Sequence, residues 1–161
     1  LKNTYAKEYL ENALISGKIY CKESWNFPTA INPTRTTEWI TKSLYEIEGE
    51  INNFERQVID KIANAENVER RHRNIERKGF YINGQINHYP DFIVKTKRWN
   101  ILLIETKGDD RDNSDSMTKI QLWELWDKYA WNQYKYFMIF ESNTLNGSKT
   151  VDDFMRLLKD L

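Results

Sequence analysis

Two carboxylates and a lysine at short spacing are the residues of this sequence best suited to chemistry: Asp91, Glu105 and Lys107. Carboxylates held close together repel each other, so a cation that prefers oxygen ligands, such as Mg²⁺, is the natural partner between them. An ammonium group beside them can stabilise developing negative charge or position a water molecule. A strand-end acid followed by a solvated ion pair would match the same three residues, so their meaning depends on the elements that carry them.

A predicted hairpin would bring the two acids together. Residues 85–95 alternate as in a strand, residues 101–104 form an apolar run typical of a buried strand, and residues 97–100 lie in the predicted turn. Pro90 removes a ladder donor, which a strand tolerates at an edge or a bulge, and Gly108 allows a close approach of ligand or backbone. Both flanking residues favour a special site at this end of the hairpin.

The register of that hairpin decides where the acids point. A turn centred near Arg98 pairs residues whose numbers add up to 196, and Asp91 and Glu105 meet that condition. Their Cβ atoms are then expected about 4.5–5.5 Å apart on one face of the sheet, with Lys107 following on the same face. A slip of one residue would place the acids on opposite faces.

A long amphipathic helix is predicted before the hairpin. Thr36 or Thr37 is suited to cap it, and apolar residues then recur at spacings typical of five or more helical turns: Leu44, Ile47, Ile51, Phe54, Val58, Ile59 and Ile62. Glu55 falls inside this apolar stripe, where a carboxylate is costly unless it reaches a cation or hydrogen bonds. It is expected to be a third acid of the site, although a glutamate that extends into solvent fits the geometry equally well. Glu48, at the stripe edge, is the weaker candidate.

The remaining predicted elements complete an α/β fold in which helices flank a mixed central sheet. A charge-rich run over residues 64–78 interrupts the helical period, and Asn83-Gly84 is a strong hairpin signal. The other predicted elements are a short helix over 5–15, a helix over 115–131, a strand over 134–140 and a helix over 151–161. Trp123 and Trp126, in the helix predicted over 115–131, fall at helical spacing, which favours core packing.

Composition limits the classes of protein that this chain can belong to. Its 161 residues suit one domain, and 24 basic against 24 acidic residues give no net charge, so an anionic partner must meet a local patch. A single cysteine, Cys21, excludes an intramolecular disulfide and fits a reducing cytoplasm. No apolar run is long enough for a membrane span.

His72 and His88 have no partners at zinc-ligand spacing and are expected to make structural hydrogen bonds. The start at Leu1 suggests a piece of a larger chain.

Two runs around the candidate residues resemble the PD-(D/E)XK nuclease superfamily: Ile86–Val94 (INHYPDFIV) and Ile104–Ser116 (IETKGDDRDNSDS). They are most similar to the C-terminal endonuclease domain of type III restriction enzyme subunits and related DEAD/DEAH-box helicase proteins. The resemblance extends over residues 52–140. It implies a restriction-endonuclease-like αβββαβ core within residues 35–161, with residues 1–34 as a lead-in from a larger chain.

The resemblance also implies a reaction and roles for individual residues. Asp91 and Glu105 would bind Mg²⁺, or Mn²⁺ in its place, with help from the carbonyl of Thr106. Lys107 would assist the attacking water, and Glu55 would complete the acidic cluster. The expected activity is that of a cytoplasmic metal-dependent endonuclease that hydrolyses DNA phosphodiester bonds.

The expected partners are double-stranded DNA, a helicase or ATPase region of the same polypeptide, and a methyltransferase or specificity subunit. Arg71 and Arg73 are candidates for phosphate contacts, and Lys119 could face the site, although a solvated charged face is the commoner meaning of such runs. The alternative function is a non-catalytic module that docks DNA or protein on the same fold. A nuclease that acts on RNA or on junctions remains a third interpretation.

Overall fold

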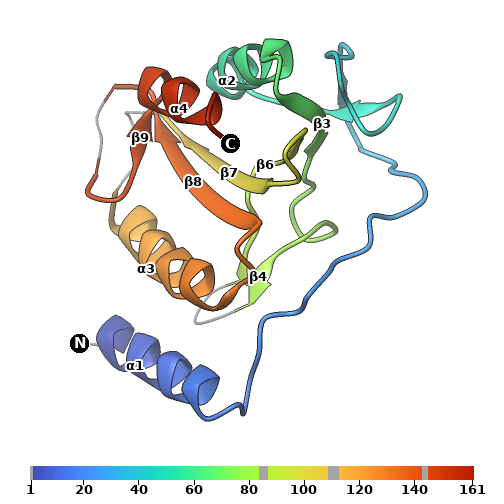
Figure 1. Cartoon of the computed structure of the whole chain (residues 1–161). Helices are drawn as coiled ribbons and strands as arrows, with labels where there is room; N and C mark the ends of the chain where they lie inside the picture. Colours follow the sequence, from blue (N-terminus) through green and yellow to red (C-terminus); the bar gives the residue numbers. More distant parts are fainter. Residues whose placement is uncertain (1, 84–86, 109–112, 143–144) are drawn as a thin grey trace.

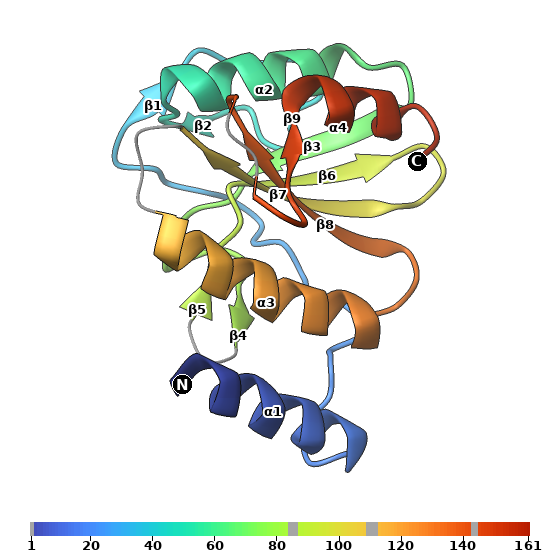
Figure 2. The same ribbon diagram turned by 90° about the vertical axis from the view of Figure 1, so that its left-hand side faces the viewer.

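A five-stranded mixed sheet forms the centre of the molecule (Figures 1 and 2). The structure is a computed structural model that describes residues 2–83, 87–108, 113–142 and 145–161. The strand order across the sheet is β3-β6-β7-β8-β9, in which β3, β6 and β7 pair antiparallel and β7, β8 and β9 pair parallel. The bounds are Val68–Arg73 for β3, Phe92–Thr96 for β6, Ile101–Lys107 for β7, Tyr134–Phe140 for β8 and Lys149–Thr150 for β9.

Helices cover both faces of this sheet (Figure 2). On one face, α2 (Asn53–Asn64) and α4 (Val151–Leu158) bury apolar side chains against Phe92, Leu102 and Ile104. On the other face, α3 (Asn113–Tyr129) packs over Leu103 and Tyr136. Successive strand residues therefore alternate between two cores, which is why the central strands lack a polar face. The expectation of an α/β fold with a mixed central sheet flanked by helices is confirmed.

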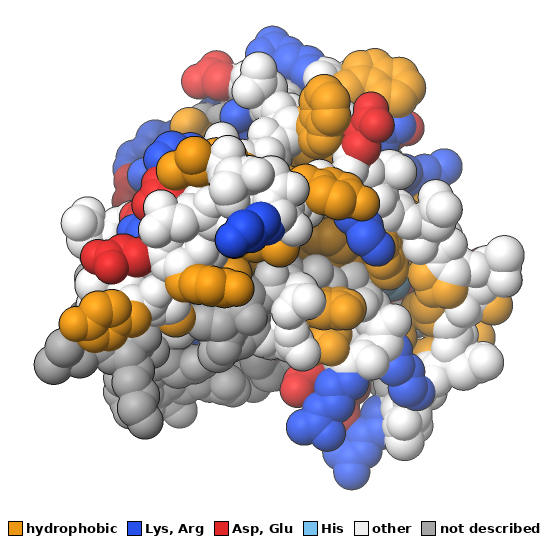
Figure 3. Space-filling view, turned by 90° about the horizontal axis from the view of Figure 1, so that it is seen from below, with side chains coloured by type: hydrophobic (Ala, Val, Ile, Leu, Met, Phe, Trp, Pro, Cys, Tyr) orange, Lys and Arg blue, Asp and Glu red, His pale blue; other side chains and the backbone are white. Residues whose placement is uncertain are grey.

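Two short pairs of strands and one further helix lie outside the sheet. The first pair is β1 (Thr36–Thr37) with β2 (Glu48–Gly49), and the second is β4 (Ile82–Asn83) with β5 (Asn87–His88). Helix α1 (Lys2–Ile15) lies next to α3, on the side away from the sheet (Figure 2). Seen from that end, hydrophobic side chains are scattered among charged ones over the surface (Figure 3). None of the helices in the described ranges has the length and hydropathy that crossing a membrane requires.

The long helix predicted from Thr36 is wrong in its extent. Only α2 forms, and it begins after Asn52, whose side chain accepts a hydrogen bond from the backbone N–H of Glu55 at 2.8 Å. The Glu55 carboxylate in turn accepts one from the Asn52 N–H at 2.8 Å, which completes a capping box. Leu44 and Ile47, which suggested earlier helical turns, are exposed. Their spacing therefore did not reflect a buried stripe.

The charge-rich run over residues 64–78 contains a strand that the sequence pattern did not predict. Strand β3 occupies the sheet edge beside β6, and its Arg71 is fully buried. The Arg71 guanidinium forms an ion pair with Glu48, which is also buried, and donates to the carbonyls of Ile40 and Thr41. A buried charge is tolerated when it is paired and hydrogen-bonded in this way. The partners lie far away in sequence, so local periodicity could not reveal the strand.

The hairpin register is as predicted. The pairs Phe92↔Ile104, Ile93↔Leu103 and Val94↔Leu102 all add up to 196. The predicted strand over 85–95 is interrupted, however, because residues 89–91 separate β5 from β6. Asp91 therefore lies directly before β6, next to the last residue pair of the ladder. The predicted strand over 134–140 and the helices near both ends are confirmed, while Leu1, Gly84 and the loop over 109–112 lie outside the described residues.

His72 gives the fold a pH dependence that can be measured. Its side chain is 4% exposed and makes edge-on contacts with the rings of Phe27 and Tyr45, each at 5.2 Å. Burial lowers the pKa of His72 to about 4, although the negative charge of Glu48 opposes that shift. Between pH 6.5 and 4, His72 is therefore protonated in the unfolded chain but neutral in the folded chain.

Acidification is therefore expected to destabilise the protein through His72. Between pH 7 and about 4.5, this residue should remove about 2 kcal/mol from the free energy of unfolding. Urea unfolding at the two pH values measures the free energy of unfolding. Between them, the His72→Gln variant should lose about 2 kcal/mol less of it than the wild type. Equal losses in the two proteins would contradict the contribution of His72.

Candidate metal-dependent active site

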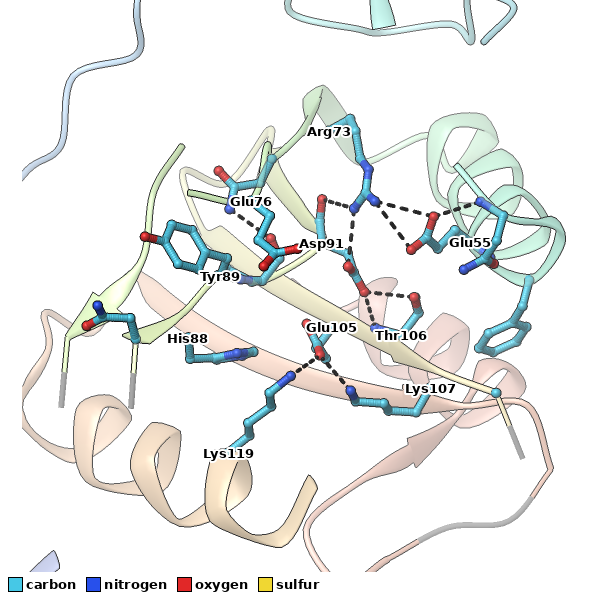
Figure 4. A pocket seen from close by; sticks show the side chains of 16 residues that line it. Glu55, Arg73, Glu76, His88, Tyr89, Asp91, Glu105, Thr106, Lys107 and Lys119 are labelled. Atoms are coloured by element: carbon cyan, nitrogen blue, oxygen red, sulfur yellow. Dashed lines mark hydrogen bonds and ion pairs between the residues drawn. The ribbon is translucent and has the colours of Figure 1, made fainter. Parts of the chain in front are cut away.

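A pocket of about 260 Å³ opens where the C-terminal end of β7 meets the N-terminal end of β6. The β3 and β5 ends, the start of α2 and the first half of α3 contribute the rest of its wall (Figure 4). Its charged lining residues in the described part of the chain are Glu55, Arg73, Glu76, Asp91, Glu105, Lys107 and Lys119. Side chains from distant parts of the sequence thus meet in one cavity.

Asp91 is held at the pocket wall by both of its carboxylate oxygens. Oδ2 accepts hydrogen bonds from the backbone N–H of Thr106 at 2.7 Å and from its hydroxyl at 2.8 Å. Oδ1 lies 3.2 Å from Nη1 of Arg73, which also donates to the Asp91 carbonyl at 3.0 Å. Asn74 fixes the preceding turn, because its side chain donates to the carbonyl of Pro90 at 2.8 Å. The carboxylate is therefore oriented before any ligand arrives.

The electrostatic environment of Asp91 disfavours its ionised form. Burial raises the pKa of Asp91, and the negative charge of Glu105 raises it further. Arg73 and the hydrogen bonds from Thr106 lower the pKa and so oppose this shift. The two acids therefore repel each other, as the sequence suggested, and a bound cation would relieve that repulsion.

Glu105 faces the α3 side of the pocket and is 4% exposed. Its Oε1 lies 3.1 Å from Nζ of Lys107 and 3.0 Å from Nζ of Lys119 (Figure 4). Lys107 follows two residues later on the same strand, so the period of two brings it to the same side. Lys119 reaches the same oxygen from α3. The structure thus brings Asp91, Glu105 and Lys107 together in one pocket.

Glu55 reaches the pocket as expected, and its contacts explain how a carboxylate is tolerated there. It is 7% exposed, and besides the capping box it lies 3.4 Å from Nη2 of Arg73. Of the two alternatives that the sequence left open, the structure shows Glu55 buried and not extended into solvent. Glu48, the weaker candidate, pairs with Arg71 and does not line the pocket.

The candidates for DNA contact divide into two groups. Arg73 and Lys119 line the pocket, where their cationic groups already contact Asp91 and Glu105 respectively. Arg71 is different, because its side chain is fully buried against Glu48. A guanidinium with no exposed surface cannot touch a phosphate, so the expectation that Arg71 contacts DNA is wrong.

Several residues near the pocket were missed or assigned less specifically by sequence reasoning. His88 lines the pocket, and its Nε2 forms a hydrogen bond with the hydroxyl of Tyr136 at 2.6 Å. The ring of Tyr136 stacks on Trp123 of α3 at 5.0 Å, so the expected core role of that tryptophan is confirmed. The spacing of Asn52 and Glu55 is that of a capping box and would have located the start of α2. No sequence signal marked the hydrogen bond between His88 and Tyr136.

The oxygen donors of the pocket fit a hard divalent cation. The carboxylates of Asp91 and Glu105 and the backbone of Thr106, the residue after Glu105, line the pocket. Mg²⁺ is commonly held by one or two carboxylates while it keeps several waters, so this set suffices. Across the described ranges, no group of three or more histidine, cysteine, aspartate or glutamate residues forms a dedicated metal cage. Glu55 is instead linked to Asp91 through Arg73, which contacts both carboxylates.

Comparisons with known proteins give no independent identification. No family model, curated protein or solved structure matches the chain. The function must therefore be argued from the geometry and electrostatics of the pocket. The strongest features for that purpose are the two carboxylates, the adjacent lysine and the oxygen-rich wall.

Proposed function

We propose that this chain is a Mg²⁺-dependent endonuclease domain that hydrolyses DNA phosphodiester bonds. The observation that carries the proposal is the convergence of Asp91, Glu105 and Lys107 in one pocket at the ends of adjacent strands. Apart from the short β4–β5 pair, which lies between β3 and β6, the chain order α2, β3, β6, β7, α3, β8 is also the order that the resemblance to PD-(D/E)XK nucleases implies. Residues and topology therefore support the same class of reaction.

Five residues of the pocket have a role in this proposal. Asp91, Glu105 and the carbonyl of Thr106 would hold the cation. Mg²⁺, when bound, supplies a Lewis acid that activates water and stabilises the leaving oxygen. The ammonium group of Lys107, beside Glu105, would orient the attacking water and stabilise negative charge that develops on the phosphate. Lys119, on the opposite wall, would attract the phosphate oxygens.

The charge of the pocket supports an anionic substrate once a divalent cation is present. The described lining contains four acidic and three basic side chains, so its formal charge is one net negative charge. A single divalent ion would reverse that balance to one net positive charge. A phosphodiester group carries one negative charge, so the loaded pocket would match it.

The charge and motif content of the sequence support a domain that depends on a larger assembly. The chain has no net charge, so the domain alone should bind DNA weakly. No P-loop motif occurs in the sequence, so an ATPase motor would have to lie elsewhere. A helicase region or a specificity subunit, as in type III restriction enzymes, would then hold the domain on its substrate.

A plasmid-nicking assay tests the proposal. In the presence of Mg²⁺ or Mn²⁺, the wild-type chain should convert supercoiled plasmid into the nicked form, and chelation of the metal should stop the reaction. The Glu105→Ala variant should nick no faster than the chelated control, whereas Glu69→Ala, at an exposed position of β3, should behave as the wild type. Equal nicking by Glu105→Ala and wild type would contradict the proposal. DNA binding without nicking at high protein concentration would favour the docking module.

A further inference from the structure

We propose that Arg73 is a built-in counter-ion that competes with the metal for Asp91 and is released when a phosphate group binds. This inference rests on the proposed function, because it concerns how the same pocket is loaded. It predicts that a divalent cation and an oxyanion bind cooperatively, with Arg73 as the link between them.

The position of Arg73 is the first support for this role. Its guanidinium lies between two acids: Nη1 is 3.2 Å from Oδ1 of Asp91, and Nη2 is 3.4 Å from Oε1 of Glu55 (Figure 4). The side chain comes from the end of β3 and is 18% exposed, so it faces the pocket and is not locked inside the core. Arg73 thus places a positive charge between Asp91 and Glu55, directly beside one of the two carboxylates proposed to hold the metal.

The bonding of Asp91 explains why Arg73 and a metal would compete. Oδ2 already accepts two hydrogen bonds from Thr106, so Oδ1 is the oxygen with more capacity for a new ligand. Oδ1 is also the oxygen that contacts Arg73. A guanidinium and a divalent ion on one carboxylate oxygen would repel each other strongly in a buried site. Metal binding therefore favours the departure of Arg73 from this oxygen.

The chemistry of arginine explains where the released group would go. A guanidinium presents a planar fork of donors that matches the oxygens of a phosphate, often through two hydrogen bonds. Arg73 also lies over the ring of Phe92, the residue after Asp91, with its Cζ 5.2 Å from the ring centroid, and this contact does not depend on Oδ1 of Asp91. An oxyanion that binds Arg73 frees Oδ1 of Asp91. By thermodynamic linkage, the oxyanion then strengthens metal binding, and the metal strengthens oxyanion binding to the same extent.

Arg73 is therefore a positioning residue whose effect appears in metal binding before any cleavage. The probe is Mn²⁺ alone, with free Mn²⁺ measured by electron paramagnetic resonance. The Arg73→Gln variant should bind Mn²⁺ about tenfold more tightly than the wild type, since a competing positive charge is removed. Arg73→Lys keeps that charge and should stay close to the wild type. Arg70→Gln, at an exposed position on the same strand, is the matched control and should also leave the affinity unchanged.

A second measurement separates competition at Asp91 from a general effect of charge. Sodium sulfate, compared with sodium chloride at equal ionic strength, should strengthen Mn²⁺ binding to the wild type and leave Arg73→Gln unaffected. The sulfate effect on the wild type can be interpreted even if Arg73→Gln folds poorly. Circular dichroism checks the folding of the variant. Tighter binding by Arg73→Gln together with its loss of the sulfate effect supports the proposal.

The failures of the two proposals can be told apart. If the wild type and Arg73→Gln bind Mn²⁺ equally, or if sulfate has no effect on the wild type, the counter-ion role of Arg73 is overturned while the metal site stands. If none of the four proteins binds Mn²⁺ at millimolar concentration, the proposed function is overturned and this inference with it.

Discussion

The Lys107→Met variant is expected to bind Mg²⁺ at least as tightly as the wild type, because a positive charge beside Glu105 is removed, and yet to cleave DNA about 10³-fold more slowly. Lys107 is buried, with its Nζ 3.1 Å from Oε1 of Glu105, and methionine has a similar length without the charge. The ammonium would act on the water and on charge that develops during the reaction, so its loss should affect the rate more than the ground state. Calorimetry measures metal binding, and nicking kinetics measure the rate.

A lysine elsewhere in the sheet controls for the loss of one positive charge. Lys95, on β6, pairs with the exposed Glu69 and lies over the ring of Trp99, away from the pocket lining. Lys95→Met should therefore nick plasmid at the wild-type rate. A wild-type rate in Lys107→Met would mean that this ammonium does not take part in the reaction.

The Asp91→Asn variant is expected to lose cleavage by about 10³-fold or more while its thermal stability is kept or increased. Burial and the charge of Glu105 both raise the pKa of Asp91, so its ionised form is less favourable in the folded chain than in the unfolded one. Asparagine removes that charge, and its amide oxygen can still accept the hydrogen bonds from Thr106. Asp91 would thus take part in the reaction while its charge lowers the free energy of unfolding.

Thermal unfolding and nicking rates measured on the same preparations test this prediction. Asp60→Asn is the control, since Asp60 lies on α2 and does not line the pocket. It should change neither quantity by much. Strong destabilisation of Asp91→Asn would instead assign Asp91 a structural role, and an unchanged nicking rate would remove it from the site.

The hairpin that carries the acids could be predicted from sequence because its determinants are local. A short polar turn between two apolar segments fixes the register, and the register fixes which residues are neighbours. The sum of 196 for Asp91 and Glu105 therefore agreed with the observed ladder. The position of Glu55 in the apolar stripe is also a local property of α2, but it allowed either burial or extension into solvent, and only the structure shows that Glu55 is buried.

The predictions from the sequence were wrong where contacts between residues far apart in the chain determined the structure. Strand β3 looked like a solvated charged segment, yet its Arg71 is neutralised by Glu48, which lies 23 positions earlier in the chain. The same contact explains why Arg71 is unavailable to DNA while Arg73, two residues on, lies in the pocket. The spacing of residues alone could not distinguish these two arginines. Only the partner that each one meets in the fold decides its role.

Calorimetric titration of Mg²⁺ into the wild-type chain and into Glu105→Ala tests the central claim most directly, because every proposed role depends on a divalent cation between Asp91 and Glu105. The account predicts saturable binding to the wild type that disappears in Glu105→Ala, with both proteins folded. The absence of binding to the wild type at millimolar Mg²⁺, or equal binding by both proteins, would contradict the claim that this pocket is a metal-dependent active site.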